Sequence, residues 1–216
     1  MYRSLRAAVF DVDGMLLDTG EFIYQAYEHT LETHSLEIPS REVIARQIGR
    51  SLPDCYDALA PNGDFPVLAK THHDFQMENF HLVKPYDGAV EVLTVLDENN
   101  IALAAFSSRK GNLIATLEIS GLLDFFRAIV QGDEVTEPKP SPEGLLLALQ
   151  RISERPSDAA MLGDAAVDIE AGKAAKVAIT VGITHGFGTE AELIEAKPDY
   201  IVHHLREIPS ILLDQH

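Results

Sequence analysis

Cysteine is almost absent from this sequence, because Cys55 is the only one among 216 residues. A single cysteine cannot form an internal disulfide, and it leaves no Cys-x-x-Cys pair for a structural zinc site or a thioredoxin-like redox centre. A disulfide framework is therefore excluded, and we expect a protein of the reducing cytoplasm.

Basic side chains and long apolar runs are scarce as well. The chain carries 17 basic against 34 acidic side chains, which gives a formal charge of -17. Such a charge repels nucleic acid phosphates and anionic membranes. No apolar run reaches the ~18 residues of a membrane span, and the N-terminal residues leave no room for a signal peptide before a strand-like segment begins. We expect no nucleic-acid partner and no membrane partner.

Short apolar runs of strand length are plentiful, and hydrophobic residues make up 46% of the chain. The runs are apolar throughout instead of alternating, which is typical of strands covered on both faces in a parallel sheet. They lie at residues 7–12, 101–107, 127–131, 159–163, 177–182 and 199–203.

Helical patterns alternate with these runs from Tyr86 onward. In residues 141–153, Pro142 suits the first helical turn and Glu143 favours the positive helix start. Residues 165–176 form a second amphipathic segment. The rhythm predicts an α/β fold, namely a Rossmann-like open parallel sheet with right-handed crossovers.

Residues 15–84 interrupt this rhythm. Phe22, Ala26 and Leu31 mark an amphipathic helix, Ser40 is a candidate cap for the next helix, and residues 67–80 have a helical pattern. No convincing buried strand is visible there. We therefore expect a core formed by 1–14 and 85–216, with a helical cap domain, 15–84, inserted after the first strand, where it excludes water and selects substrate.

Chemically active side chains follow the ends of several predicted strands. Open parallel sheets bind ligands at the carboxyl ends of their strands. Carboxylates, a hydroxyl and a lysine at one such edge are typical of magnesium-assisted phosphoryl transfer. These residues are Asp11, Asp13, Ser107, Lys139, Asp164 and Asp168.

Each residue type suits a step of such a reaction. Asp11 and Asp13 are two positions apart, so in an extended chain they project to one side about 7 Å apart. One carboxylate can attack phosphorus to form an acyl phosphate, and the other can move the proton. Asp164 offers an oxygen to Mg²⁺, Lys139 a fixed positive charge, and Ser107 a hydrogen bond to a phosphoryl oxygen.

Each residue also has a simpler interpretation when it is taken alone. Asp13-Gly14 is an ordinary turn dipeptide. Asp164 could cap the following helix, and Lys139 could be a solvated loop lysine. What favours chemistry is that all of these residues follow different predicted strands, in one order.

These motifs resemble those of the haloacid dehalogenase-like superfamily. The resemblance is carried by DVDG from Asp11, the apolar strand that ends in Ser107, KPSPE from Lys139, and GDAAVD with Asp164 and Asp168. It extends over nearly the whole chain and is greatest to the phosphoglycolate phosphatase and pyrophosphatase-like branch. It implies a phosphatase with an aspartyl-phosphate intermediate.

The resemblance further implies Mg²⁺ bound by Asp11, the backbone carbonyl of Asp13 and Asp164, with Asp168 assisting through metal-bound water. Three departures from the family's usual pattern stand out. Met15 stands in place of a threonine and Ala165 in place of a serine, and Ser108-Arg109 occurs where Asn-Lys is frequent.

The leaving group is less well specified by the sequence. Arg50, which follows Gly49 at an expected helix end in the predicted cap, is a candidate for binding a substrate carboxylate or second phosphate. Ser108 and Arg109 are further candidates for contacts with the substrate. We expect a small phosphate ester, such as phosphoglycolate or a sugar phosphate, and a monomer or homodimer. The alternatives are a phosphomutase of the β-phosphoglucomutase type and a weakly active homologue that serves as a binding module.

Overall fold

The computed structural model describes residues 5–48 and 50–214. Residues 1–4, which contributed to the argument against a signal peptide, and Gly49, which precedes Arg50, lie outside the described residues. By their contacts, the described residues form two compact units. The first comprises the described parts of Met1–Asp18 and Pro85–His216, and the second is Thr19–Lys84.

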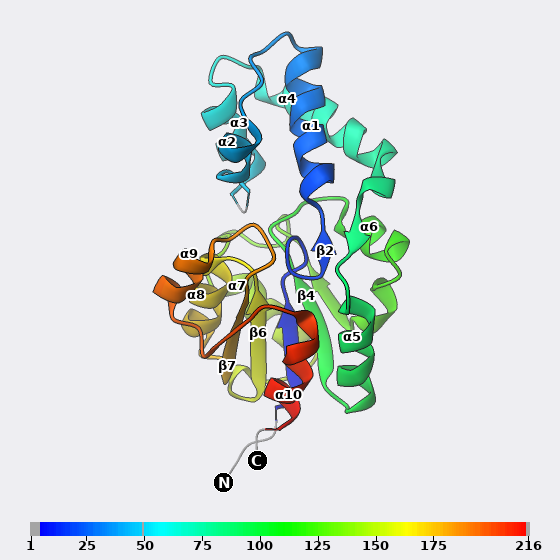
Figure 1. The fold of residues 1–216 in the computed structure, drawn as a ribbon, viewed down its shortest axis with the longest axis vertical. Coiled ribbons are helices and arrows are strands. Elements are labelled where there is room, and N and C mark those ends of the chain that lie inside the picture. The colour runs from blue at the N-terminus through cyan, green and yellow to red at the C-terminus, as the bar shows by residue number, and fades with distance from the viewer. Residues whose placement is uncertain (1–4, 49, 215–216) are drawn as a thin grey trace. The chain divides into compact units, whose positions relative to one another are not determined.

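The first unit is built on a six-stranded sheet (Figure 1). Its strands are β1 (Ala7–Phe10), β4 (Ala102–Phe106), β5 (Ala128–Val130), β6 (Ala159–Gly163), β7 (Ile179–Ile183) and β8 (Tyr200–Val202). Each matches one of the apolar runs, and all neighbouring strands are parallel. The predicted α/β fold with a parallel sheet is confirmed.

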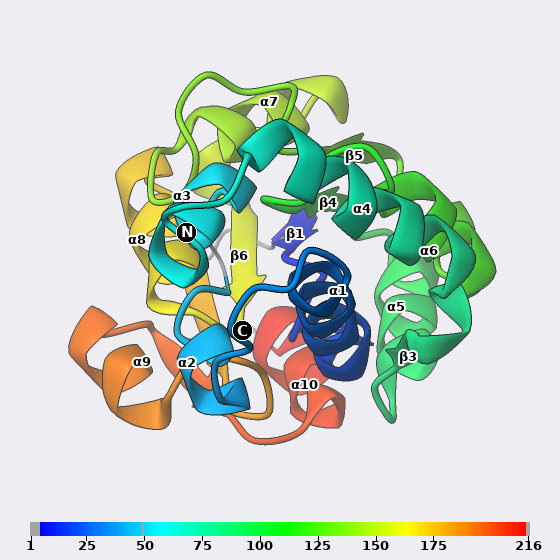
Figure 2. The ribbon, with the colours of Figure 1, turned by 90° about the horizontal axis from the view of Figure 1, so that it is seen from above.

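Helices cover both faces of this sheet (Figure 2). α7 (Glu143–Arg151) and α8 (Ala166–Ala175) pack on strands from one side, while α5 (Ala89–Glu98) and α10 (Ile208–Leu213) contact each other on the opposite side. The remaining helical elements of this unit are α6 (Leu113–Ile119), α9 (Glu190–Ala196), η2 (Leu123–Phe125), η3 (Pro156–Asp158) and η4 (Leu205–Glu207). Two-sided coverage explains why the strands are apolar throughout.

The strand order places β1 in the middle of the sheet. The order is β5-β4-β1-β6-β7-β8, so the chain proceeds outward from β1 to β5 and then crosses back to β6 on the other side. Phe10, the last residue of β1, pairs with Ala105 of β4 and Leu162 of β6. The carboxyl ends of these three strands are therefore level, at a topological switch point where α/β sheets bind ligands.

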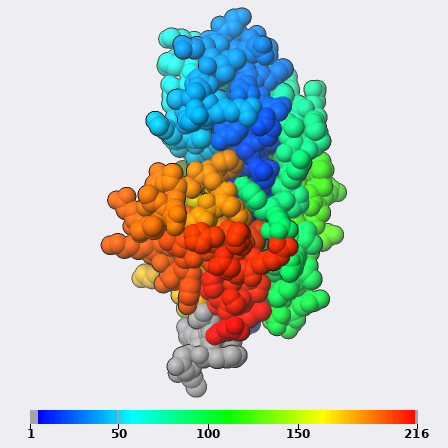
Figure 3. All heavy atoms as spheres, viewed as in Figure 1, coloured from blue at the N-terminus to red at the C-terminus, as the bar shows by residue number. Residues whose placement is uncertain are grey.

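The C-terminal segment packs beside α5, as the red and green surfaces in Figure 3 show. Arg206 forms ion pairs with Asp87 and Glu91 at the start of that helix, at 2.5 and 2.7 Å. Among the described residues, no helix combines the length and the apolar character that crossing a membrane requires.

The second unit is helical. It contains α1 (Gly20–Thr33), α2 (Arg41–Ala45), α3 (Leu52–Leu59), α4 (Phe65–Glu78) and η1 (Phe80–Leu82). α1, α2 and α4 correspond to predicted helices, whereas α3 was not predicted. Ser40 precedes α2 in an extended conformation but makes no side-chain capping bond. The core includes Tyr27, Tyr56 and Leu68.

Two short strands lie near the limits of residues 15–84, where none was visible in the sequence. β2 (Leu17–Asp18) pairs with β3 (Lys84–Pro85), and the amide of Tyr86 donates to the carbonyl of Leu16 at 2.9 Å. Strands of two residues are too short to produce a periodic pattern. The lid function of the inserted helices stays a prediction.

Candidate active site

Asp11 and Asp13 lie immediately beyond the carboxyl end of β1. The strand ends at Phe10, two residues earlier than its apolar run predicts, although the amide of Asp11 still donates to the carbonyl of Leu162 at 2.8 Å. Asp11 is therefore held against the neighbouring strand and is buried. Asp13 follows in the turn, where it is partly exposed.

Gly14 allows the chain to turn directly over a second carboxylate. Its φ is +80°, and a Cβ atom at this position would lie 2.3 Å from Asp164 Oδ2. Any L side chain would therefore be strained and would also collide with Asp164. The glycine of the DVDG motif is required both by the turn and by the close approach of Asp164.

Lys139 joins the carboxylates from the loop before α7. Its Nζ lies 2.5 Å from Asp11 Oδ1 and 2.7 Å from Asp168 Oδ1, and its side chain is only 2% exposed. Glu143 helps to hold this loop, because its carboxylate accepts from the amides of Thr136 and Glu137 at 3.0 and 2.9 Å. The lysine is thus a buried cation, not a solvated loop residue.

Asp164 and Asp168 follow β6 and are fixed by backbone amides. The amide of Phe187 donates to Asp164 Oδ2 at 2.7 Å, and the amide of Ala165 donates to Asp168 Oδ2 at 3.1 Å. Asp168 therefore caps the start of α8, whereas Asp164 receives its amide from the loop after β7. The helix-capping role considered for Asp164 belongs to Asp168.

Asp11, Asp164 and Asp168 fit a divalent cation. One carboxylate oxygen from each lies within 4.8 Å of the others, and all three residues are buried. Hard cations such as Mg²⁺ prefer oxygen ligands, chiefly carboxylates. Against three acidic groups the cluster contains only the ammonium of Lys139, so a divalent cation would balance the remaining charge.

Burial sets the protonation of this cluster. Burial raises the pKa of Asp11 well above its usual range; Lys139 opposes this effect, and repulsion from the other carboxylates adds to it. Burial, with repulsion from Asp168, also raises the pKa of Asp164 to about 7. Burial lowers the pKa of Lys139, but Asp11 and Asp168 outweigh that effect and raise it above its usual value. The buried carboxyl groups are therefore costly to ionise without a further cation.

A second cluster surrounds Asp13. Arg109 Nε donates to Asp13 Oδ2 at 3.1 Å, and Arg109 Nη2 pairs with Asp13 Oδ1. Ser107 Oγ donates to Asp13 Oδ2 at 3.2 Å. On its other side, Arg109 Nη1 donates to Thr116 Oγ1 at 2.8 Å. Both oxygens of Asp13 are therefore engaged by donors from the segment after β4.

The sequence matches the family model of the haloacid dehalogenase-like hydrolases over residues 8–181. This range includes the whole of both clusters. The chain belongs to the haloacid dehalogenase-like hydrolase family. The family assignment made from the motifs is thereby confirmed, and so is the expectation of an enzyme.

Relatives and solved structures agree with this assignment. The hydrolase is 31% identical to pyrophosphatase PpaX of Bacillus pumilus over 97% of both chains, and 28% identical to pyrophosphatase PpaX of Listeria welshimeri over the full length of both. A predicted phosphoglycolate phosphatase from Haemophilus somnus has the same fold, with a TM-score of 0.90 over 96% of this chain and 97% of that one at 20% identity. A protein of Thermotoga maritima assigned as a β-phosphoglucomutase gives a TM-score of 0.78 at 27% identity, over 97% and 99%.

Within the first unit of this hydrolase, the structure brings most of the predicted site residues together. Asp11, Lys139, Asp164 and Asp168 form one cluster, and Asp13, Ser107 and Arg109 form the other. Ser108 lies between Ser107 and Arg109 in the sequence. Its backbone packs closely on Gly132, where a Cβ atom would lie 2.3 Å from the Ser108 carbonyl oxygen. Arg50 belongs to the second unit, where Nη1 donates to Gln47 Oε1 at 2.5 Å, and its substrate role stays a prediction.

Sequence reasoning did not identify the loop after β7 as part of the site. His185 Nε2 lies 3.0 Å from the carbonyl oxygen of Met15, and the amide of Phe187 binds Asp164. Met15, which stands where the family usually has threonine, is fully buried. It takes part in this contact through its backbone carbonyl, and its side chain offers no hydroxyl. The closely spaced glycines of this loop were the signal in the sequence that could have indicated a close approach to the site. The structure shows such an approach at Gly186, where a Cβ atom would lie 2.2 Å from Asp164 Oδ2.

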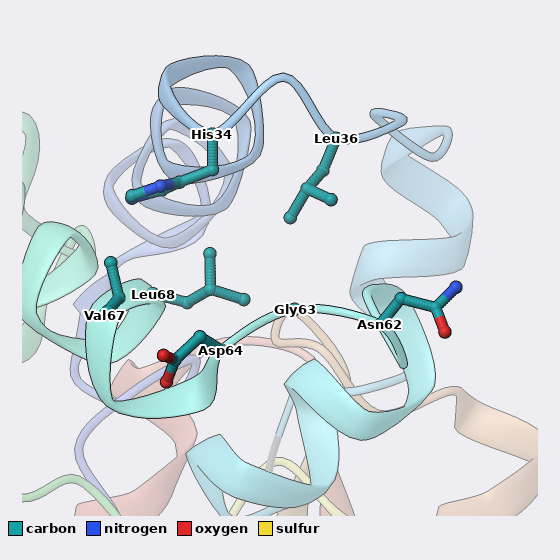
Figure 4. A pocket seen from close by; sticks show the side chains of 7 residues that line it. All are labelled: His34, Leu36, Asn62, Gly63, Asp64, Val67 and Leu68. Carbon is teal, nitrogen blue, oxygen red and sulfur yellow. The ribbon is translucent and has the colours of Figure 1, made fainter.

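The second unit contains a pocket of its own, with a volume of about 220 Å³ (Figure 4). It is lined by His34, Leu36, Asn62, Gly63, Asp64, Val67 and Leu68. None of the motif residues contributes to it, so the pocket is separate from the carboxylate cluster.

Proposed function

We propose that this protein hydrolyses a small phosphorylated metabolite through an aspartyl-phosphate intermediate on Asp11. The observation that carries this proposal is the buried contact of Asp11 with Lys139 beside Asp164 and Asp168, at the carboxyl end of the central strand. A carboxylate at this position can attack phosphorus, and the neighbouring cation offsets repulsion from an anionic substrate.

Proton transfer is the proposed role of Asp13. As Asp11 forms its bond to phosphorus, the bond from phosphorus to the leaving oxygen breaks, and that oxygen takes a proton from the Asp13 carboxyl group. Asp13 then accepts a proton from the water that hydrolyses the acyl phosphate. Two such steps return both aspartates to their initial states and release inorganic phosphate.

We further propose Mg²⁺ as the cofactor, held by Asp11, the carbonyl of Asp13 and Asp164, with Asp168 assisting. Bound there, the ion would supply charge neutralisation for the phosphoryl oxygens. The support is the buried set of three carboxylates. Ser107 is proposed to donate a hydrogen bond to a phosphoryl oxygen, and Ser108, Arg109 and Arg50 to contact the substrate.

The substrate class is proposed from chemistry and similarity together. The relatives from Bacillus pumilus and Listeria welshimeri are named pyrophosphatase, and the structural neighbour from Haemophilus somnus is named a predicted phosphoglycolate phosphatase. The compounds in these names, pyrophosphate and phosphoglycolate, are both small and strongly anionic. Inorganic pyrophosphate, phosphoglycolate and sugar phosphates are therefore the compounds to compare.

The test is release of inorganic phosphate from this panel, with and without Mg²⁺. Asp11→Asn is expected to abolish turnover, because an amide is a poor nucleophile toward phosphorus. Asp124→Asn makes the same chemical change at an exposed residue and should retain full activity. Undiminished turnover by Asp11→Asn would rule out the proposed intermediate.

A phosphomutase is the second candidate, favoured by the similarity to a protein assigned as a β-phosphoglucomutase. It would use the same aspartyl phosphate but return the phosphoryl group to a sugar. Product analysis with sugar phosphates separates the two activities, since a mutase yields isomerised sugar phosphate with little free phosphate. A protein that is inactive on every compound yet folded would instead support the binding-module alternative.

A further inference from the structure

Arg109 holds both carboxylate oxygens of Asp13 and so keeps them from contacting a substrate oxygen. The guanidinium group pairs with both carboxylate oxygens, and Ser107 Oγ donates to one of them as well. Bidentate pairing with arginine occupies the lone pairs of a carboxylate. To contact a leaving oxygen, Asp13 must therefore leave this pairing.

The pair is much less exposed than a surface ion pair of the same unit. The side chains of Arg109 and Asp13 are 9% and 16% exposed, whereas those of Arg127 and Asp97, which lie 4.0 Å apart, are 56% and 54% exposed. Partly buried, bidentate contacts are stronger and less screened than exposed ones. The Arg109–Asp13 pair is therefore a specific feature of the site, and the exposed pair is its natural control.

The donors that hold Asp13 are also the donors that a phosphoryl group requires. A guanidinium fork matches phosphate oxygens as well as it matches a carboxylate. Ser107 Oγ is proposed to donate a hydrogen bond to a phosphoryl oxygen. In the structure it donates to Asp13 and accepts from the Arg109 amide at 3.1 Å. Thr116 anchors the far side of the guanidinium group, so Arg109 can exchange one anion for another while it keeps its place.

We propose that Arg109 is a latch on Asp13 that the substrate phosphoryl group opens. This inference rests on the proposed phosphatase function and concerns the same site. The arriving phosphoryl oxygens replace the Asp13 side chain on Arg109 and Ser107, and the released side chain is then free to turn toward the leaving oxygen. Arg109 thereby acts as a positioning residue for Asp13 in the absence of substrate and as a phosphoryl ligand in its presence.

Competition between Asp13 and phosphate can be measured without turnover. The experiment is calorimetric titration of inorganic phosphate into the Mg²⁺-loaded protein and its variants. Arg109→Met removes the charge and the fork, and should weaken phosphate binding by about tenfold or more, the value of one hydrogen bond to a charged group. Asp13→Asn removes the competing anion and should tighten binding. Arg127→Met, at the exposed control pair, should leave binding unchanged.

The double variant decides between a latch and plain charge repulsion. If Asp13 competes for Arg109, Asp13→Asn tightens phosphate binding less in the Arg109→Met background than in the wild type. If Asp13 only repels phosphate, its removal tightens binding as much or more once Arg109 is absent, and that result would overturn the latch. Thermal unfolding of each variant shows that it is folded.

Steady-state kinetics gives an independent readout. Arg109→Met should raise the KM for the best phosphate ester more than it lowers kcat, because Asp13 is no longer restrained, and Arg109→Lys should restore part of the affinity. A loss in kcat with an unchanged KM, of equal size in Arg109→Met and Arg109→Lys, would contradict the latch. A wild-type protein that neither binds phosphate nor turns over any ester would overturn both the proposed function and the latch. An active enzyme in which Asp13→Asn tightens phosphate binding as much without Arg109 as with it would overturn the latch alone.

Discussion

Buried charge is the dominant feature at the scale of single residues. Asp11, Asp164 and Asp168 lie close together, and two of them, Asp11 and Asp168, contact the ammonium group of Lys139. All four residues are buried. Charges in such surroundings are stabilised only by partners of opposite sign. The arrangement therefore costs stability in the metal-free protein, and a divalent cation would relieve that cost.

Asp164→Asn is predicted to stabilise the metal-free protein at neutral pH. The pKa of Asp164 is about 7 in the folded state, against roughly 4 in an unfolded chain. The folded state binds more protons between these values, so stability is full below pH ~4 and falls as the pH rises to about 7. The loss is at most roughly 4 kcal/mol, at about 1.4 kcal/mol per pKa unit. Asparagine does not ionise and avoids the loss.

The measurement is urea unfolding of both proteins from pH 4 to 8 in the presence of a chelator. The advantage of the variant should grow as the pH rises, and adding Mg²⁺ should stabilise the wild type more than the variant. A constant difference between the two proteins across this pH range would contradict the assigned cause.

The places of several site residues in the fold follow from the sequence, but their side-chain partners do not. Strand ends and motif order bring Asp11, Lys139 and Asp164 to one edge before any coordinates are known. That Arg109 pairs with Asp13, or that the amide of Phe187 binds Asp164, depends on loop conformations that no periodic pattern encodes. Side-chain partners across loops were therefore the part that required the structure.

The turn after β1 is the decisive element of the site. It carries Asp13 and passes over Asp164 at Gly14, while the loop after β7 contacts it through His185. The site residues thus depend on the mutual fit of two loops at the sheet edge. A change in either loop is expected to displace carboxylates that lie on a different strand.

Gly14→Ala is predicted to destabilise the protein much more than Gly121→Ala. Both glycines have positive φ, +80° and +69°, so each alanine pays a conformational penalty of about 1 kcal/mol. Only at Gly14 does the new Cβ atom meet other atoms, namely Asp164 and Phe187, because none lies within 4 Å at Gly121. Overpacking should add about 1 to 3 kcal/mol.

Denaturant unfolding with and without Mg²⁺ compares the two variants. Gly14→Ala should also lose much of the stabilisation by Mg²⁺, since it displaces Asp164, whereas Gly121→Ala should retain it. Equal effects of the two alanines would mean that the close approach to Asp164 is unimportant.

Elements were predictable to the extent that their length allowed a pattern. The six sheet strands follow from apolar runs, because two-sided burial selects such residues over the whole strand. β2 and β3 have two residues each and show no pattern. α3, a helix of eight residues that begins Leu52-Pro53, gave no clear periodic signal and was missed.

The charge of the whole molecule opposes its proposed substrates. A formal charge of -17 repels phosphate esters, although Lys139 and Arg109 attract them locally. Salt screens long-range repulsion, with a Debye length of about 10 Å at ~0.1 M, more than it screens contacts at a buried site. Added salt should therefore weaken the long-range repulsion by the net charge more than it weakens the attraction of a phosphate ester to the local cations.

Raising NaCl from about 0.01 to about 0.1 M at saturating Mg²⁺ is predicted to increase kcat/KM for an anionic ester, with kcat nearly unchanged. The increase should be larger for phosphoglycolate, which also carries a carboxylate, than for a sugar phosphate. A decrease with salt would show that attraction by the local cations outweighs the net charge.

Trapping the covalent intermediate tests the central claim most directly. The protein is mixed with its best substrate, quenched in acid within one turnover and reduced with borohydride, which converts an aspartyl phosphate to homoserine. Peptide mass spectrometry then locates the modified residue. The account predicts homoserine at position 11 and none in Asp11→Asn. Modification of another residue, or full turnover without any trapped intermediate, would contradict it.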